Sequence, residues 1–159
     1  MTDSRSPVRL SVLDRLLEPG ATAGMDRQAS VDRLRQGVRR DLESLLNSHA
    51  PLWRLPEECP ETATSVLNYG LPDYTGVGES MEFRRTAISR QIARLIDVHE
   101  PRLTRVRVDV RRDEAGDKWA LRLRVEAVLK ADPVIEPIVF DSILRPAGTG
   151  IELTVEADG

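Results

Sequence analysis

The spacing of apolar residues changes once along this chain of 159 residues, at Pro101. Before Pro101, segments carry apolar residues at three- and four-residue steps, the spacing of amphipathic helices. After it, apolar and polar residues alternate, the spacing of half-buried strands. Helices first and strands afterwards predict an α+β fold, with N-terminal helices packed on an antiparallel sheet of about four strands.

The strongest helical pattern covers residues 30–47, with Ser30 as the expected N-cap. Its apolar face comprises Val31, Leu34, Val38, Leu42, Leu45 and Leu46. Its opposite face mixes Arg33, Arg35, Arg39 and Arg40 with Asp32 and Asp41, which indicates a solvated face rather than a nucleic-acid surface. A further helix is expected over residues 80–99, with Ser80 as its cap.

Residues 6–20 predict a short helix that ends at Pro19 and Gly20. It carries an apolar stripe made of Val8, Val12, Leu13, Leu16 and Leu17. An isolated helix this short is marginal in water, so the stripe needs a surface, either on its own domain or on a partner protein. The sequence leaves both open. We expect residues 1–29 to form a short helix and a flexible connection, and residues 30–159 to form a single α+β domain.

Prolines and glycines interrupt residues 51–79 and predict a structured loop. Ser65 is expected to cap one helical turn, and Asn68 or Gly70 to supply a left-handed residue. This turn would pack Tyr69 and Leu71 against the core or a neighbouring subunit. The predicted packing loop comprises Asn68, Tyr69, Gly70, Leu71, Pro72 and Asp73.

Four segments carry the expected sheet. Residues 104–111 and 119–130 alternate and predict a long hairpin around a turn at 112–117. A third strand is expected at 137–144, with an irregular start between Pro133 and Pro137. Residues 151–156 alternate again and predict the fourth strand.

Composition excludes several classes of protein. The net charge is only −3, from 23 basic and 26 acidic residues, so no field favours nucleic acid or an acidic membrane. Cys59 is the single cysteine, and no apolar run has transmembrane length. His49 and His99 lie on different elements without a cysteine or carboxylate at ligand spacing, so no metal site and no cofactor are predicted. The simplest expectation is a cytoplasmic protein.

Five segments, in this order, resemble the TssE family of type VI secretion baseplate subunits, which is similar to a small wedge protein of contractile phage baseplates. They are residues 13–17, 41–47, 65–73, 99–103 and 140–144. The resemblance implies a structural wedge subunit in the cytoplasm, recruited to a membrane-anchored secretion complex. Its implied partners are TssF and TssG, the TssB–TssC sheath and other baseplate subunits such as TssK. It implies no nucleic acid, no small-molecule substrate and no direct membrane insertion.

The family's Glu-Pro-Arg signature corresponds to Glu100, Pro101 and Arg102. A carboxylate is oddly placed at a helix C-terminus, and Pro101 forces Glu100 into an extended conformation. We expect Glu100 and Arg102 to project from this corner and bind TssF and TssG; an internal pair that staples the corner is the alternative. The resemblance also implies that the end strands of the sheet accept sheath strands, with Arg105, Arg107, Asp109 and Thr154 on those edges.

The alternative function is a peptidoglycan-hydrolysing, lysozyme-like enzyme with Glu100 as its acid. A glycosidase needs two carboxylates of unequal pKa across the scissile bond. The aromatic residues that could line a sugar cleft are few, and Trp119 and Phe140 are expected in the core. We therefore predict no catalytic residue and no enzymatic activity.

Overall fold

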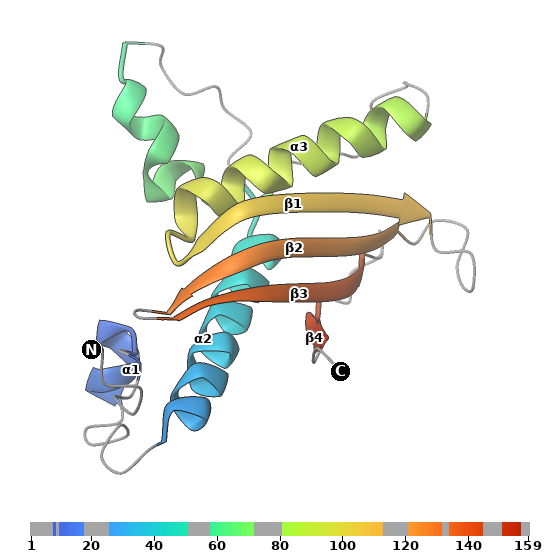
Figure 1. The fold of residues 1–159 in the computed structure, drawn as a ribbon. Helices are drawn as coiled ribbons and strands as arrows, with labels where there is room; N and C mark the ends of the chain where they lie inside the picture. Colours follow the sequence, from blue (N-terminus) through green and yellow to red (C-terminus); the bar gives the residue numbers. More distant parts are fainter. Residues whose placement is uncertain are drawn as a thin grey trace.

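The computed structural model describes residues 8, 10–17, 26–50, 58–71, 81–112, 121–131, 134–144 and 151–156. Its helical elements are α1 (Val12–Leu17), α2 (Arg27–Asn47), the 3₁₀ turns η1 (Pro60–Thr64) and η2 (Val66–Asn68), and α3 (Met81–His99). The strands are β1 (Leu103–Arg112), β2 (Leu121–Ala131), β3 (Val134–Leu144) and β4 (Thr154–Glu156). The strands pair antiparallel in the order β1-β2-β3-β4, so the predicted α+β fold is confirmed (Figure 1).

The core lies between the sheet and two helices. Helix α2 crosses one face of the sheet, and α3 runs beside β1 (Figure 1). All six apolar residues predicted for the inner face of α2 are buried. They meet sheet side chains that alternate inward, among them Leu123, Val125 and Phe140, as the period of two requires. Each such side chain contributes about 1.5–3 kcal/mol through burial, so these faces fix how α2 lies on the sheet.

The start of α2 differs from the prediction. The helix begins at Arg27, and Asp26 is the N-cap, with its carboxylate accepting the backbone N–H of Ala29 at 2.7 Å. The predicted cap, Ser30, is buried inside the helix, where its hydroxyl donates to the carbonyl of Asp26 at 2.8 Å. The predicted capping by Ser65 is confirmed, because its Oγ accepts the N–H of Leu67 at 3.2 Å. Ser80 and most of the predicted turn at 112–117 lie outside the described residues.

A β-bulge near the start of β1 changes which side chains face the core. The register with β2 shifts by one residue between Thr104 and Arg107, and Arg105 has a φ of 55°, which is uncommon for a residue other than glycine. Without the extra residue, Leu103 and Val106 would face opposite sides of the sheet. With it, the buried Leu103 and the partly buried Val106 both pack on the core.

The fourth strand is shorter than predicted. Only Thr154–Glu156 pairs with β3, whereas Ile151 and Leu153 are buried ahead of it. Their backbone N–H groups donate to side chains of α2, Ile151 to Oδ1 of Asn47 at 2.6 Å and Leu153 to Oε1 of Glu43 at 2.9 Å. Hydrogen bonds to a helix therefore replace strand pairing over residues 151–153.

The predicted packing loop contacts the C-terminal ends of α2 and α3. The N–H of Leu71 donates to the carbonyl of Ser48 at 2.8 Å, and the N–H of Ala50 donates to the carbonyl of Leu71 at 2.9 Å. Leu71 is buried, and the ring of Tyr69 meets His99 edge-on, with centroids 5.2 Å apart. Tyr69 and Leu71 thus pack on this chain's own core. Pro72 and Asp73 lie outside the described residues.

No helix within the described ranges is long and apolar enough to cross a membrane.

Gly70 is required at its position for two reasons. Its φ is 107°, a conformation that residues with a side chain rarely adopt, and an added Cβ would lie 2.5 Å from the carbonyl oxygen of Ser48. Gly70→Ala is expected to lower the free energy of unfolding by about 1–3 kcal/mol, measured by urea denaturation. The control is Val66→Ala in the same loop, because Val66 is exposed. Equal stability of both variants would contradict this account of the turn.

Candidate functional site

Glu100 lies at the corner where α3 ends and β1 begins. Its backbone N–H donates to the carbonyl of Ile96 at 2.8 Å, and its carbonyl accepts the N–H of Leu103 at 3.1 Å, which turns the chain toward the sheet. The Glu100 side chain is buried, with the residue 4% exposed, whereas Pro101 between it and Arg102 is exposed. A buried carboxylate requires a compensating partner in the fold.

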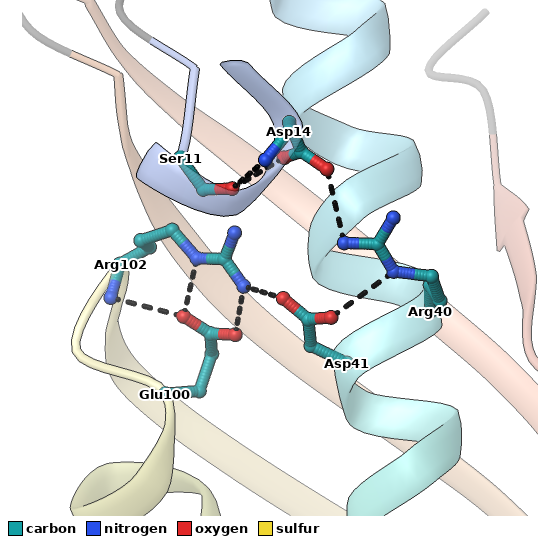
Figure 2. A network of polar contacts seen from close by, with 6 residues as sticks. All are labelled: Ser11, Asp14, Arg40, Asp41, Glu100 and Arg102. Atoms are coloured by element: carbon teal, nitrogen blue, oxygen red, sulfur yellow. Dashed lines mark hydrogen bonds and ion pairs between the residues drawn. The ribbon is translucent and has the colours of Figure 1, made fainter. Parts of the chain in front are cut away.

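Arg102 provides that partner. Its Nε donates to Oε1 of Glu100 at 2.6 Å, and its Nη2 donates to Oε2, so the ion pair is bidentate (Figure 2). The backbone N–H of Arg102 also donates to Oε1 at 3.2 Å. The prediction that Glu100 projects from the corner is therefore wrong, because its carboxylate is buried and both of its oxygens accept hydrogen bonds from Arg102. The internal pair, the alternative left open by the sequence, is what the structure has.

The pair is extended onto α2. Nη2 of Arg102 also donates to Oδ2 of Asp41 at 2.5 Å, and the other oxygen of Asp41 accepts Nε of Arg40 at 3.2 Å. Gly37 lies one turn earlier on α2, and its lack of a side chain leaves room for Asp14 and Arg102. A Cβ at Gly37 would lie 3.3 Å from Oδ2 of Asp14 and 3.8 Å from Nη1 of Arg102. The face of α2 predicted to be merely solvated thus carries ordered ion pairs at Arg40 and Asp41.

Arg40 carries the network to the N-terminal segment. Its Nη2 donates to Oδ1 of Asp14 at 3.0 Å, and Oδ2 of Asp14 accepts the hydroxyl of Ser11 at 2.6 Å (Figure 2). Ser11 in turn accepts the N–H of Asp14 at 3.1 Å and caps the short helix α1. We call this set the corner network: Ser11, Asp14, Arg40, Asp41, Glu100 and Arg102.

The ion pairs shift the pKa values of three members. Burial works to raise the pKa of Asp14, but hydrogen bonds from Ser11 and Arg40 outweigh it and hold this pKa below its ordinary value of 3.8. The hydrogen bond to Asp14 raises the pKa of Arg40, and the hydrogen bond to Glu100 raises that of Arg102 despite burial. The network therefore favours the charged form of each of these groups.

Helix α1 shows its apolar side chains to solvent. Val8 and Leu10, just before it, are buried in the core, whereas Val12 is 70%, Leu13 56%, Leu16 71% and Leu17 66% exposed. The six-residue helix is thus anchored by Val8, Leu10 and Asp14 while its apolar side faces outward. Contiguous apolar patches are rarely exposed on soluble proteins, and those that are exposed commonly mark interaction sites. We call Val12, Leu13, Leu16 and Leu17 the α1 apolar face.

Sequence reasoning singled out Glu100 and Arg102, with their internal pairing only as the alternative, and missed the four other residues of the corner network. Arg102 and Asp41 lie 61 positions apart, and Arg40 and Asp14 lie 26 apart. Neither separation leaves a periodic signal. One clue was available at Asp14, the acidic residue of α1, which lies on the side of the helix opposite the apolar stripe. The predicted edge residues Arg107 and Asp109 are exposed on β1, and Thr154 on β4, at the two ends of the sheet.

This arrangement is suited to binding a protein rather than to acid catalysis. A general acid must reach the bond that it protonates. Glu100 is buried with both carboxylate oxygens accepting hydrogen bonds from Arg102. What the site presents outward is the α1 apolar face, held in place by charged groups behind it.

Comparisons with known proteins agree with a small α+β assembly subunit. The family model described as "Baseplate wedge protein gp25" matches residues 32–134, more than half of the chain. The chain belongs to the gp25 baseplate wedge family, and its role is that of a structural baseplate component. No curated protein sequence matches it.

A solved structure titled "The baseplate complex from the type VI secretion system" contains a chain of the same fold. The two chains are 14% identical with a TM-score of 0.51, and the match covers 74% of this chain and 98% of the other.

The Glu100–Arg102 pair gives the first prediction from this site. Arg102→Met keeps the length of the side chain but leaves the buried Glu100 carboxylate unpaired, so the free energy of unfolding is expected to fall by about 3–5 kcal/mol. Glu100→Gln combined with Arg102→Met removes both charges, so the free energy of unfolding of the double variant should fall much less. Urea denaturation at neutral pH measures both.

The matched control is Arg111→Met. Arg111 pairs with Asp109 on the open side of β1, with 78% of its side chain exposed, so the change should stay within about 0.5 kcal/mol. If the single and double variants at the corner lost the same stability, the carboxylate would not depend on Arg102.

The lowered pKa of Asp14 predicts how stability changes with pH. Because the folded pKa lies below the ordinary value of 3.8, ionised Asp14 stabilises the fold above that pH, and this stabilisation is lost as pH falls through the folded pKa. The stability difference between the wild type and Asp14→Asn should be full at neutral pH and shrink below about pH 4. Urea midpoints of both proteins across this range measure it; a difference that stayed constant down to about pH 2 would contradict the ion pair with Arg40.

Proposed function

We propose that this chain is the TssE-like wedge subunit of a type VI secretion baseplate, that it binds TssF and TssG, and that it helps to start the contractile sheath. Membership of the baseplate wedge family supports the assembly role, and the fold shared with a chain of a type VI secretion baseplate complex supports the choice of system. The α1 apolar face is the single observation that carries the binding proposal.

The proposed binding site combines the α1 apolar face with the corner beneath it. A free helix of six residues has little stability in water, so a partner would have to order it on binding. Here the corner network and the buried Val8 and Leu10 hold the helix before the partner arrives. Ordering in advance lowers the entropy lost on association. Glu100 and Arg102 serve the interface indirectly, by positioning α1, while the exposed Pro101 lies on the surface of the corner.

The proposed partner surface is apolar and helical, supplied by TssF and TssG. Four large aliphatic side chains on one short helix suit an apolar groove between helices, in which anchors at three- and four-residue steps dock together. The enzyme alternative has no comparable support, since its candidate acid is buried against Arg102.

The α1 apolar face is tested by Leu13→Glu combined with Leu16→Glu. Both side chains are mostly exposed, so the variant should fold with an unchanged melting temperature but lose recovery of co-expressed TssF and TssG in a pull-down by about tenfold or more. The control is Ile135→Glu, which places a charge on another exposed aliphatic residue, 76% exposed on β3. Equal recovery by the Leu variant and the control would refute binding through α1.

For the sheath, we propose that an end strand of the sheet accepts an extended segment from a sheath subunit. The sheet ends at β1 and β4, and an end strand offers unpaired backbone groups. The charged side chains of Arg105, Arg107, Asp109 and Arg111 on β1, or of Glu152 and Glu156 around Thr154 at the other edge, would limit pairing with wrong partners. The bulge at Arg105 interrupts the pairing of β1 with β2 between Thr104 and Arg107, so its longest uninterrupted paired stretch is residues 107–112, and β4 comprises Thr154–Glu156.

Proline tests the two edges separately. Arg107→Pro or Thr154→Pro removes a backbone donor and obstructs pairing with a further strand. At least one variant should fold by circular dichroism and enter the TssF–TssG complex, yet fail to start sheath polymerisation in cells. If every folded variant assembled sheaths normally, strand addition at these edges would not start the sheath.

A further inference from the structure

A groove on the outer side of α3 lies apart from the corner network and from the α1 apolar face. It has a volume of about 530 Å³, and α3 lines it from Ala87 to His99, with Asn68 of η2 at one side. Its residues follow the three- and four-residue steps of one helix face over about three turns, roughly 17 Å. The groove therefore extends along one helix face, which suits a rod-like segment.

Two arginines dominate the charge of this groove. Arg90 and Arg94 lie one turn apart, and both are exposed. Across the described residues, neither guanidinium has a hydrogen bond or an ion pair. This separates them from Arg35, Arg40, Arg102 and Arg124, each of which meets a carboxylate of this chain. None of the residues lining the groove carries a carboxylate.

Exposed apolar side chains and one buried, unpaired polar atom lie in the groove or next to it. Val98 is 44% exposed within the groove, and Val66 and Leu67, just before Asn68, are 84% and 51% exposed. Nε2 of His99 is buried without a hydrogen-bond partner in the part of the chain that the structure describes. A buried polar atom left unpaired is unfavourable, and a donor or acceptor from a partner would relieve it.

We propose that this groove binds an acidic amphipathic helix of a partner protein. Carboxylates four residues apart on that helix would face Arg90 and Arg94, because residues at this spacing lie one above the other on both helices. Its aliphatic residues would contact Val98 and the exposed side chains of η2, a helix-against-helix packing. The charge complementarity selects the occupant: unpaired guanidinium groups in a groove without acids favour carboxylates. This proposal does not depend on the α1 apolar face.

The test uses a synthetic fluorescein-labelled helical peptide of about 15 residues, with two glutamates four apart beside leucines. Fluorescence anisotropy with the full chain should show binding that weakens at high salt. Arg94→Glu should weaken it about tenfold, since it places like charges together. Lys130→Glu, the same charge change on an exposed strand residue, should have little effect. Both variants alter exposed residues, so folding is retained.

Two comparisons complete the experiment. A peptide with lysine in place of both glutamates should not bind, and a short DNA duplex should not compete with the acidic peptide. The proposal is overturned if the lysine peptide binds as well as the acidic one, or if Arg94→Glu and Lys130→Glu bind the acidic peptide equally. Tighter binding of the duplex would assign the two arginines to phosphate instead and would also overturn it.

Discussion

The contact between Glu100 and Arg102 is the interaction on which the rest of this structure depends. It lies where α3 ends and β1 begins, and the carbonyl of Arg102 accepts the N–H of Lys130 at 2.8 Å, next to the first pairs of the sheet. A carboxylate at a helix C-terminus is unfavourable, and a buried one more so. The adjacent guanidinium removes both penalties and then reaches Asp41, so one pair fixes α3, β1 and α2 relative to one another (Figure 2).

The same charges set the position of the N-terminal helix. Through Arg40 and Asp14, the network reaches α1, which otherwise contacts the domain through the buried segment at Val8 and Leu10. Because Asp14 points inward, the apolar residues on the other sides of this short helix point outward. The acidic residue on the opposite side of the helix from the apolar stripe thus determines which side of the helix is displayed. The consequence is a short helix held by the network with its apolar side exposed, which is the arrangement that the proposed docking would use.

Local patterns predicted the elements of this fold well. The inner face of α2 was predictable because helical periodicity is local and burial against a sheet follows from it. The bulge at Arg105 was readable in principle, since Leu103 and Val106 can share a face only if one residue is inserted between Thr104 and Arg107. The N-cap was missed because Asp26 lies before the periodic residues begin.

The long-range contacts were not predictable in the same way. The α1 stripe was visible in the sequence, but its direction depends on the pairing of Asp14 with Arg40 across the fold. The shortened β4 depends likewise on Asn47 and Glu43 capturing the N–H groups of Ile151 and Leu153. Such contacts produce no periodic pattern in the sequence. Which charged residues form pairs depends on how the core packs.

Amide hydrogen exchange on this chain, free and bound to TssF and TssG, tests the central claim most directly. If the α1 apolar face is the docking surface, exchange over residues 12–17 should slow markedly in the complex, because a covered helix opens less often. The surface of η1, which takes no part in the proposed interface, should exchange as before. Unchanged exchange over residues 12–17 in a complex that had formed would contradict the account.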